Sequence, residues 1–322
     1  MSIPPEFLHY STIASTITIS SIGVGIGQGM ASYSALDALN RQPAARNDII
    51  RVATLGMAII ETVAIFGLLI AALMLFSKPF CSESNFYVCV SECGIACALF
   101  FSSLVVGIAC ALPAQAACRA IARQPFSVQH IFSLMLMTQV LIQTPILSAF
   151  LVSLFIQGQS AAATTLNDSL RLIASGLCIG LGSIGPAIGL SLFAKAAIDG
   201  IGRNAKAYKK LLSFTLISEA IIETPIIFCL LISLILLFVV PHTEIDDPIT
   251  GIIFISAALC LGMGTLGSGI SSGKTGAAAC TQIADNPENA SVISRTSMLA
   301  QGLIETIVIY ATLLSLVMIL FR

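Results

Sequence analysis

The chain is short of charged residues. Only 10% of its 322 residues are Asp, Glu, Lys or Arg, against about 25% in a typical soluble domain. It contains no Trp and only three His, and its formal net charge is −1. So little charge cannot cover a soluble particle, and a nucleic-acid-binding protein would need a basic patch. No positively charged segment opens the sequence, so no cleavable signal peptide is expected.

Metal ligands are also scarce. Three His residues and the lack of any Cys-x-x-Cys pair argue against a zinc site. Seven of the ten Cys residues lie in apolar runs, where Cys acts as a small hydrophobic residue. Cys81, Cys89 and Cys93 lie in or beside a polar connector and could pair in an oxidising compartment. We expect no resident cofactor.

What the chain has in abundance is apolar sequence: 57% of residues are hydrophobic and the mean hydropathy is +0.97. The apolar stretches exceed the roughly 20 residues that cross a bilayer. They predict an all-α integral membrane protein with eight transmembrane helices, near residues 11–39, 47–77, 92–121, 129–157, 169–200, 208–240, 250–283 and 291–321. Most Lys and Arg residues lie near the short connectors at 40–46, 122–128, 201–207 and 284–290, which assigns these connectors to the cytoplasmic side.

An internal repeat organises the eight helices. The phrase Ile-Ile-Glu-Thr, or a close variant, surrounds Glu61, Gln143, Glu223 and Glu305, at spacings of 82, 80 and 82 residues. Each of these residues follows the same point of its short connector by 18 residues. The sequence therefore predicts four tandem antiparallel hairpins, which we delimit as 8–77, 88–157, 166–240 and 248–322.

The first helix of each hairpin repeats a stripe of small residues. In the first hairpin these are Gly23, Gly25, Gly27 and Gly29, and the equivalent positions of the other hairpins are small except at Val105. Small residues let membrane helices approach closely, because lipid offers no hydrophobic drive to helix association.

Glu61, Glu223 and Glu305 fall in the middle of apolar helices. Inserting a charged residue at the bilayer centre costs about 2.5–3.5 kcal/mol. Such a carboxyl group stays neutral by holding a proton or by coordinating a monovalent cation, and both states make it an ion carrier. The alternative is a protonated strut between helices. Thr62, Thr144, Thr224 and Thr306 follow directly. We favour their hydroxyls as ion ligands, although a hydroxyl can instead bond back to its own helix.

These motifs resemble those of a known family. Gly-Val-Gly-Ile-Gly-Gln-Gly-Met-Ala at 23–31, Arg41-Gln42-Pro43 and the stretch from Gly56 to Glu61 are similar to the proteolipid (c-type) rotor subunit of F-type rotary ATP synthases. The resemblance covers nearly the whole chain as four copies. It implies a non-catalytic subunit of the membrane sector, with ATP chemistry on other subunits. It also implies a homo-oligomeric rotor ring that turns in lipid against a stator a subunit, which bears an arginine.

The resemblance further implies individual roles. Glu61, Glu223 and Glu305 would carry the ion, with Gln28 as a second ligand, Thr62 as the hydroxyl neighbour and Tyr310 as the tyrosine that locks the site. The short connectors would bind the central stalk subunits through Arg41, Gln42, Pro43, Arg123, Gln124, Pro125, Arg203 and Asn204. No nucleic acid is implied, and a bacterial inner membrane is the expected location.

Several positions depart from the family pattern. Gln143 replaces the carrier and cannot release a proton, so the second hairpin should be ion-silent. At the position of Gln28 the other hairpins have Cys110, Leu190 and Ser272, so the ligand set is not repeated. We therefore favour H+ as the coupling ion, with Na+ as the alternative.

Three further residues stand outside the pattern. Glu219, one turn before Glu223, is either a second ligand or a polar strut. Lys274 lies about 200° round its helix from the ion face, and Asp285 replaces the connector arginine of the fourth hairpin. The rival functions are a V-type ATPase proteolipid, an eight-span secondary transporter, for which Pro145 and Pro225 provide the main support, and a structural assembly factor.

Overall fold

Each hairpin folds around the same kind of short turn. The first helix ends at the connector residue Arg41 or its counterpart, and a single 3₁₀ turn then leads directly into the second helix. These 3₁₀ turns are Pro43–Ala45, Pro125–Ser127, Ala205–Ala207 and Pro287–Asn289. Proline opens three of the four, because its fixed backbone angle suits the first position of a helical turn.

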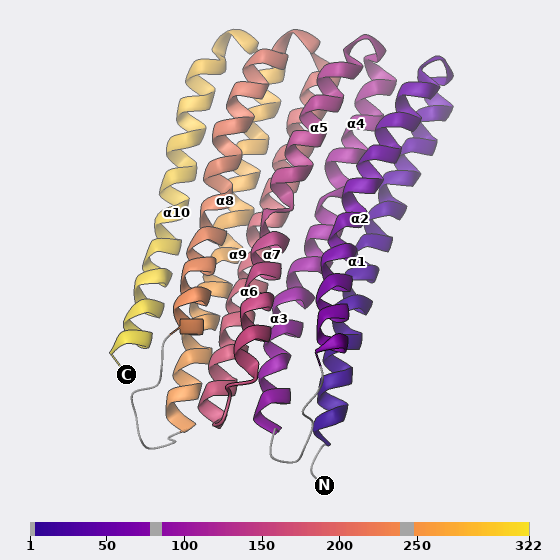
Figure 1. Cartoon of the computed structure of the whole chain (residues 1–322). Helices are drawn as coiled ribbons and strands as arrows, with labels where there is room; N and C mark the ends of the chain where they lie inside the picture. Colours follow the sequence, from indigo (N-terminus) through magenta and orange to yellow (C-terminus); the bar gives the residue numbers. More distant parts are fainter. Residues whose placement is uncertain (1–3, 78–85, 239–247, 322) are drawn as a thin grey trace.

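The computed structural model describes residues 4–77, 86–238 and 248–321, and every regular element in these ranges is helical. The helices are α1 (Pro5–Arg41), α2 (Arg46–Phe76), α3 (Phe86–Ala109), α4 (Ala111–Arg123), α5 (Val128–Ile142), α6 (Thr144–Ser160), α7 (Leu166–Arg203), α8 (Tyr208–Phe238), α9 (Pro248–Asp285) and α10 (Ala290–Leu320). The predicted all-α arrangement of tandem hairpins is confirmed. Figure 1 shows the hairpins side by side, with the short turns together at one end and both chain termini at the other.

The bundle has two layers. The first helices of the hairpins (α1, α3 with α4, α7 and α9) pack against one another in sequence order, and the second helices lie outside them and pack less closely on their neighbours. Accordingly, 72% of the most apolar stretch of the α7 span is buried, against 22% of that of the α10 span. The outer helices therefore present apolar side chains to the surroundings, as membrane spans do.

Close backbone contact holds the inner layer together. A Cβ atom added at Gly27 would collide with the backbone of Gly107, and one added at Gly189 would collide with that of Gly269. These contacts lie between hairpins 1 and 2 and between hairpins 3 and 4. The small-residue stripe thus forms the packing surface that the repeat predicts.

Among the residues that the structure describes, seven helical segments are long and apolar enough to cross a membrane, and α1 is not one of them. Its N-terminal half is rich in Ser and Thr, which lowers its hydropathy. Their hydroxyls donate to carbonyls of the preceding turn, as from Thr12 to Leu8 and from Ser20 to Thr16, at 2.9 and 2.7 Å. Because these hydroxyl donors are satisfied within the helix, α1 can lie alongside α2 in the bilayer.

Hairpin 2 departs from the expected continuous helices. Its first helix breaks at Cys110, between α3 and α4, and its second breaks at Gln143, between α5 and α6. A proline follows each break, Pro113 and Pro145, and proline cannot donate the backbone hydrogen bond to the residue four before it. By contrast, Pro186 and Pro225 lie within the uninterrupted helices α7 and α8.

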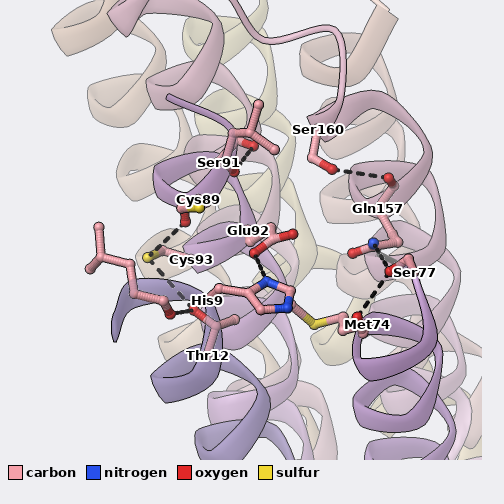
Figure 2. A network of polar contacts seen from close by, with 12 residues as sticks. His9, Thr12, Met74, Ser77, Cys89, Ser91, Glu92, Cys93, Gln157 and Ser160 are labelled. Atoms are coloured by element: carbon pink, nitrogen blue, oxygen red, sulfur yellow. Dashed lines mark hydrogen bonds and ion pairs between the residues drawn. The ribbon is translucent and has the colours of Figure 1, made fainter. Parts of the chain in front are cut away.

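A polar network joins hairpins 1 and 2 at the end opposite the short turns (Figure 2). His9 Nδ1 lies 2.6 Å from Glu92 Oε2, and both side chains are buried. Gln157 of α6 donates to the Ser77 hydroxyl just after α2, at 3.0 Å. Cys93 is a free thiol in this region, and Cys81 lies outside the described residues.

Candidate functional site

The three repeated glutamates stand at the midpoints of their helices. α2, α8 and α10 each contain 31 residues, and Glu61, Glu223 and Glu305 are the central residues. Fifteen residues on either side correspond to about 22 Å of helix, which exceeds half of a bilayer's hydrocarbon thickness. Glu61 is exposed, and Glu223 and Glu305 are half-buried. The three carboxyl groups therefore lie at the middle of the spans, and Oε1 of Glu305 is buried with no hydrogen-bond partner among the described residues.

Gln143, at the equivalent position of hairpin 2, is buried and its Nε2 donates to the Ile59 carbonyl of hairpin 1, at 2.5 Å. Ile59 lies two residues before Glu61. The amide thus links hairpin 2 to the neighbouring second helix at the level of the first carboxyl group. It also stands at the α5–α6 break, where the helical hydrogen bonding is interrupted.

The repeated threonines bond to their own helices. Their hydroxyls donate to the carbonyls of Ile59, Leu141, Ala220 and Leu303, at 2.7, 2.9, 3.2 and 2.7 Å. The carbonyl three or four residues back is the nearest acceptor in a helix. Of the two roles open for these hydroxyls, the structure therefore shows the bond back to the helix, with Thr62 Oγ1 donating to Ile59 and not to Glu61.

Gln28 is hydrogen-bonded one turn from the carrier of its hairpin, whereas Tyr310 has no hydrogen bond to its carrier among the described residues. Gln28 of α1 is half-buried, and its Nε2 donates at 3.4 Å to the carbonyl of Met57, one turn before Glu61. Tyr310 of α10 is 68% exposed. It follows Glu305 by five residues, which turns it about 140° round the helix. Within the described ranges no hydrogen bond joins its hydroxyl to Glu305.

Sequence reasoning did not anticipate a row of polar links one turn before the carriers. Gln139 is fully buried, and its Nε2 donates to the carbonyls of Gly56 and Cys110, at 3.2 and 2.9 Å. Gln301, also fully buried, accepts from the Ser218 hydroxyl of hairpin 3 at 2.9 Å. The bonds from Gln139 to Gly56 and from Ser218 to Gln301 each join adjacent second helices. The signal was present in the sequence, because the two glutamines share one register of the repeat.

Glu219 occupies the same register in hairpin 3 but has no such link. It is fully buried, and neither carboxyl oxygen has a hydrogen-bond partner among the described residues. Leaving a buried polar group unsatisfied costs about 1–3 kcal/mol, and more for a charge. Glu219 is therefore the least satisfied polar group near the carriers.

Near the short turns, ion pairs connect hairpin 2 to hairpin 3 and hairpin 3 to hairpin 4. Arg123 NH1 lies 3.5 Å from Asp199 Oδ1, and Arg203 NH1 lies 3.4 Å from Asp285 Oδ1. Asn204 Nδ2 also donates to the Ala284 carbonyl, at 2.9 Å. Asp285, which breaks the arginine pattern of the connectors, thus pairs with the arginine of the preceding hairpin. The side chains of Arg203 and Asp285 are 40% and 47% exposed, so this pair contributes only about 0–1 kcal/mol.

The first connector forms its ion pair within one hairpin. Arg41 Nε lies 3.0 Å from Asp37 Oδ2, one turn earlier in α1.

Lys274 is exposed on α9. No group of three or more His, Cys, Asp or Glu side chains that could hold a metal ion occurs in the part of the chain described.

The fold and site together define an integral membrane protein of repeated hairpins, three of which carry a carboxyl group at mid-span. The family of ATP synthase C subunits matches four segments of the sequence, residues 12–74, 93–156, 173–236 and 255–318. The chain belongs to this family, as a tandem repeat of four units.

Individual relatives are the size of a single hairpin. The ATP synthase c subunit of Natranaerobius thermophilus is 49% identical over 61 residues, which is 19% of this chain and 71% of the relative. One of the numbered ATP synthase c subunits of Cereibacter sphaeroides is 40% identical over 79 residues, 24% of this chain and 95% of the relative. The chloroplastic c subunit of Phaeodactylum tricornutum is 43% identical over 65 residues, 20% of this chain and 79% of the relative.

Glu219 generates a stability prediction. We expect Glu219→Gln to raise the thermal unfolding temperature of the purified protein, because glutamine is hydrogen-bonded at the equivalent positions 139 and 301. The gain should be about 1 kcal/mol. Glu61→Gln, at an exposed position, is the control and should leave the unfolding temperature unchanged. A loss of stability in the Glu219 variant would instead mean that its carboxyl group holds an ion that an amide cannot replace.

Proposed function

We propose that the chain is an ion-carrying rotor subunit of the membrane sector of an ATP synthase, with Glu61, Glu223 and Glu305 as the carriers. The observation that carries this proposal is the central position of all three in 31-residue spans. Each carboxyl group takes up an ion from one aqueous path, crosses the membrane-facing arc in the neutral state, and releases the ion at the second path. Family membership supports this function.

The working form we propose is a closed ring of several copies. A Cβ atom added at Gly25 or Gly29 of α1, or at Gly267 of α9, would meet no other atom within 4 Å outside its own helix turn. Gly25 and Gly29 lie on the register that is buried in the other three hairpins. Gly267 and Ser271 are exposed, although the equivalent residues of α7, Gly185 and Gly189, are packed against α9.

The two open edges are therefore complementary. Between hairpins 1 and 2 and between hairpins 3 and 4, the face equivalent to Gly23 and Gly27 packs against the face equivalent to Gly25 and Gly29 of the next hairpin. The fourth hairpin of one copy offers the first face, and the first hairpin of another copy offers the second. This head-to-tail contact closes into a ring if the rotation per copy divides a full turn.

H+ is the coupling ion we favour. An Na+ site needs several oxygen ligands. In hairpin 1 the Gln28 amide is bonded to a backbone carbonyl, and the other hairpins have Cys110, Leu190 and Ser272 at its position. A carboxyl group in an apolar setting is sufficient for H+ alone. Every carrier of a ring must take the same ion, and the possible Na+ ligands are not repeated in all hairpins, which favours H+. Na+ is the alternative.

Gln143 makes hairpin 2 silent in this scheme. Its amide cannot release a proton, and its bond to the Ile59 carbonyl supports a packing role. With three carriers per four hairpins, the ring moves fewer ions per turn than a ring of the same size in which every hairpin has a carrier. Fewer ions per turn raise the driving force needed to make each ATP, so the ratio suits a complex that works in the direction of hydrolysis and pumping.

The partners we propose are a stator a subunit with an arginine beside the carriers, and the central stalk at the short turns. Arg41, Gln42 and Pro43 of hairpin 1 are exposed or half-buried and available to the stalk. Arg123 forms an ion pair with Asp199, and Arg203 forms one with Asp285. ATP chemistry lies on other subunits, and the membrane is a bacterial inner membrane. Similarity to ATP synthase c subunits favours this assignment over a V-type proteolipid.

Carbodiimide labelling tests the carriers. A carboxyl-reactive carbodiimide modifies protonated carboxyl groups in apolar sites, so we expect modified peptides at Glu61, Glu223 and Glu305 and none at residue 143. The labelled peptides are identified by mass spectrometry over a pH series, with and without Na+. Protection by raised pH alone supports H+, and protection by Na+ at neutral pH supports Na+. No labelling at any of the three positions would exclude the rotor function.

A glycine substitution tests the ring. Gly25→Leu adds a side chain to the open edge of α1, so the chain should fold but assemble poorly, as measured by native mass spectrometry of the solubilised protein. Gly302→Leu is the matched control. A Cβ atom added at Gly302 also meets nothing within 4 Å, but Gly302 lies on the outer side of α10. It should assemble as the wild type does. Normal assembly of the Gly25 variant would contradict the proposed contact.

A further inference from the structure

A groove of about 720 Å³ separates the outer helices α8 and α10 near the short turns. The groove is open to the surroundings, and α8 and α10 are neighbouring helices of the outer layer (Figure 1). Its lining combines charged residues near the turns with apolar residues further along the helices. The charged residues are Lys209, Lys210, Glu288 and Arg295, and the large apolar residues are Phe214, Ile217, Met298 and Leu299. We call this feature the α8–α10 groove.

Small side chains keep this groove open. Between α2 and α5, the ring of Phe132 lies against an arginine of α2, 5.4 Å from the guanidinium carbon. Between α5 and α8, His130 stacks on Tyr208 with ring centroids 4.0 Å apart. In α10, the residues equivalent to Phe132 and Tyr208 are Ser294 and Ala290, and both line the groove. The repeat therefore leaves a space here that aromatic rings occupy at the other two interfaces.

The groove carries a positive charge near the turns. Lys209 and Lys210 are adjacent cations found only in hairpin 3, since the equivalent pairs are Asn-Asp, Gln-His and Ser-Val. Arg295 faces them from α10, and Glu288 is the single carboxylate of the lining. Lys210 Nζ donates to the Pro287 carbonyl at 2.6 Å. Three cations against one anion make this end attractive to a phosphate group.

The charge is located at the depth of lipid headgroups. Lys209 precedes the central residue of α8 by 14 residues, or about 21 Å of helix. Arg295 precedes the central residue of α10 by ten residues, or about 15 Å. The hydrocarbon core extends about 15 Å from the bilayer centre, with the headgroups beyond it. Phe214 and Met298 are closer to the centre, within the depth of the acyl chains.

We propose that the α8–α10 groove binds one anionic phospholipid per chain. The phosphate lies between Lys209 and Arg295, and an acyl chain follows the wall formed by Phe214 and Met298. Basic pockets between membrane helices on the cytoplasmic side bind anionic headgroups in this way. A soluble partner is disfavoured because the groove continues as an apolar surface into the hydrocarbon layer. This site goes beyond the ion-carrying function and does not depend on it.

Native mass spectrometry of the full, detergent-solubilised assembly tests the site. The probes are phosphatidylglycerol and phosphatidylcholine with identical acyl chains. We expect phosphatidylglycerol to be retained in preference, at one strong site per chain. The Lys209→Gln/Arg295→Gln variant should lose about fivefold in retention for each cation removed. Lys206→Gln is the control, because Lys206 is an exposed cation of the nearby turn that does not line the groove.

A second variant changes the shape of the groove and leaves its charge. Ser294→Phe introduces the aromatic residue that hairpin 2 has at this position, so it should expel the lipid. Val292→Phe, at a 67% exposed α10 position that is outside the groove lining and exposed in every hairpin, is its matched control. Equal retention of the two lipids by the wild type would overturn the proposal, as would unchanged retention in the double variant. Retained lipid with loss of soluble subunits from the complex would make the groove a protein contact instead.

Discussion

Backbone contact between glycine-lined helices is the constraint on which the rest of the structure depends. Gly27 lies against Gly107 and Gly189 against Gly269, so the first helices form a tight inner layer. The second helices must then lie outside this layer, where they pack less closely and face the surroundings. That placement leaves Glu61 exposed at the middle of α2. A carboxyl group can exchange an ion with a neighbouring subunit only from such an outer position.

Hairpin 2 combines the loss of a carrier with stronger packing. Gln143 and Gln139 are buried and bond to backbone carbonyls of hairpin 1, whereas the carboxyl groups of the other hairpins remain exposed or half-buried. Both helices of this hairpin break near a proline. A broken helix is also a feature of transporters. Here the break falls in the one hairpin that lacks a carboxyl carrier, so it is associated with packing and not with a substrate site.

Much of this arrangement follows from the sequence alone. The fixed offset between connector and carrier predicts both the hairpins and the mid-span glutamates, because helix rise per residue is constant. The predicted first helices of the hairpins are shorter than those observed: α1 begins at Pro5 and α3 at Phe86, where the predicted starts are 11 and 92. The polar first turns lower the local hydropathy, although hydrogen bonding continues through them.

Other features depend on contacts between hairpins, which a sequence pattern does not specify. The pairing of Arg203 with Asp285 gives a role to a substitution that, in the sequence, only removes an arginine from a connector. The bond from Thr62 to Ile59 reflects local geometry that competes with the expected ligand role. The α8–α10 groove arises because Ser294 stands where another hairpin has an aromatic ring. In each case the sequence contains the residue but does not identify its neighbour.

The order of hairpins in the ring provides the most direct test of the central claim. Round the ring, hairpins 2 and 4 alternate with hairpins 1 and 3. Glu305→Gln therefore leaves every silent hairpin flanked by two hairpins that have carriers. Glu61→Gln or Glu223→Gln instead creates two adjacent silent hairpins beside Gln143. ATP-driven ion uptake into vesicles containing the reconstituted complex should therefore fall less in the Glu305 variant than in the other two. Equal uptake in all three variants, or the largest loss at Glu305, would contradict a rotor in which the carriers pass the stator in sequence order.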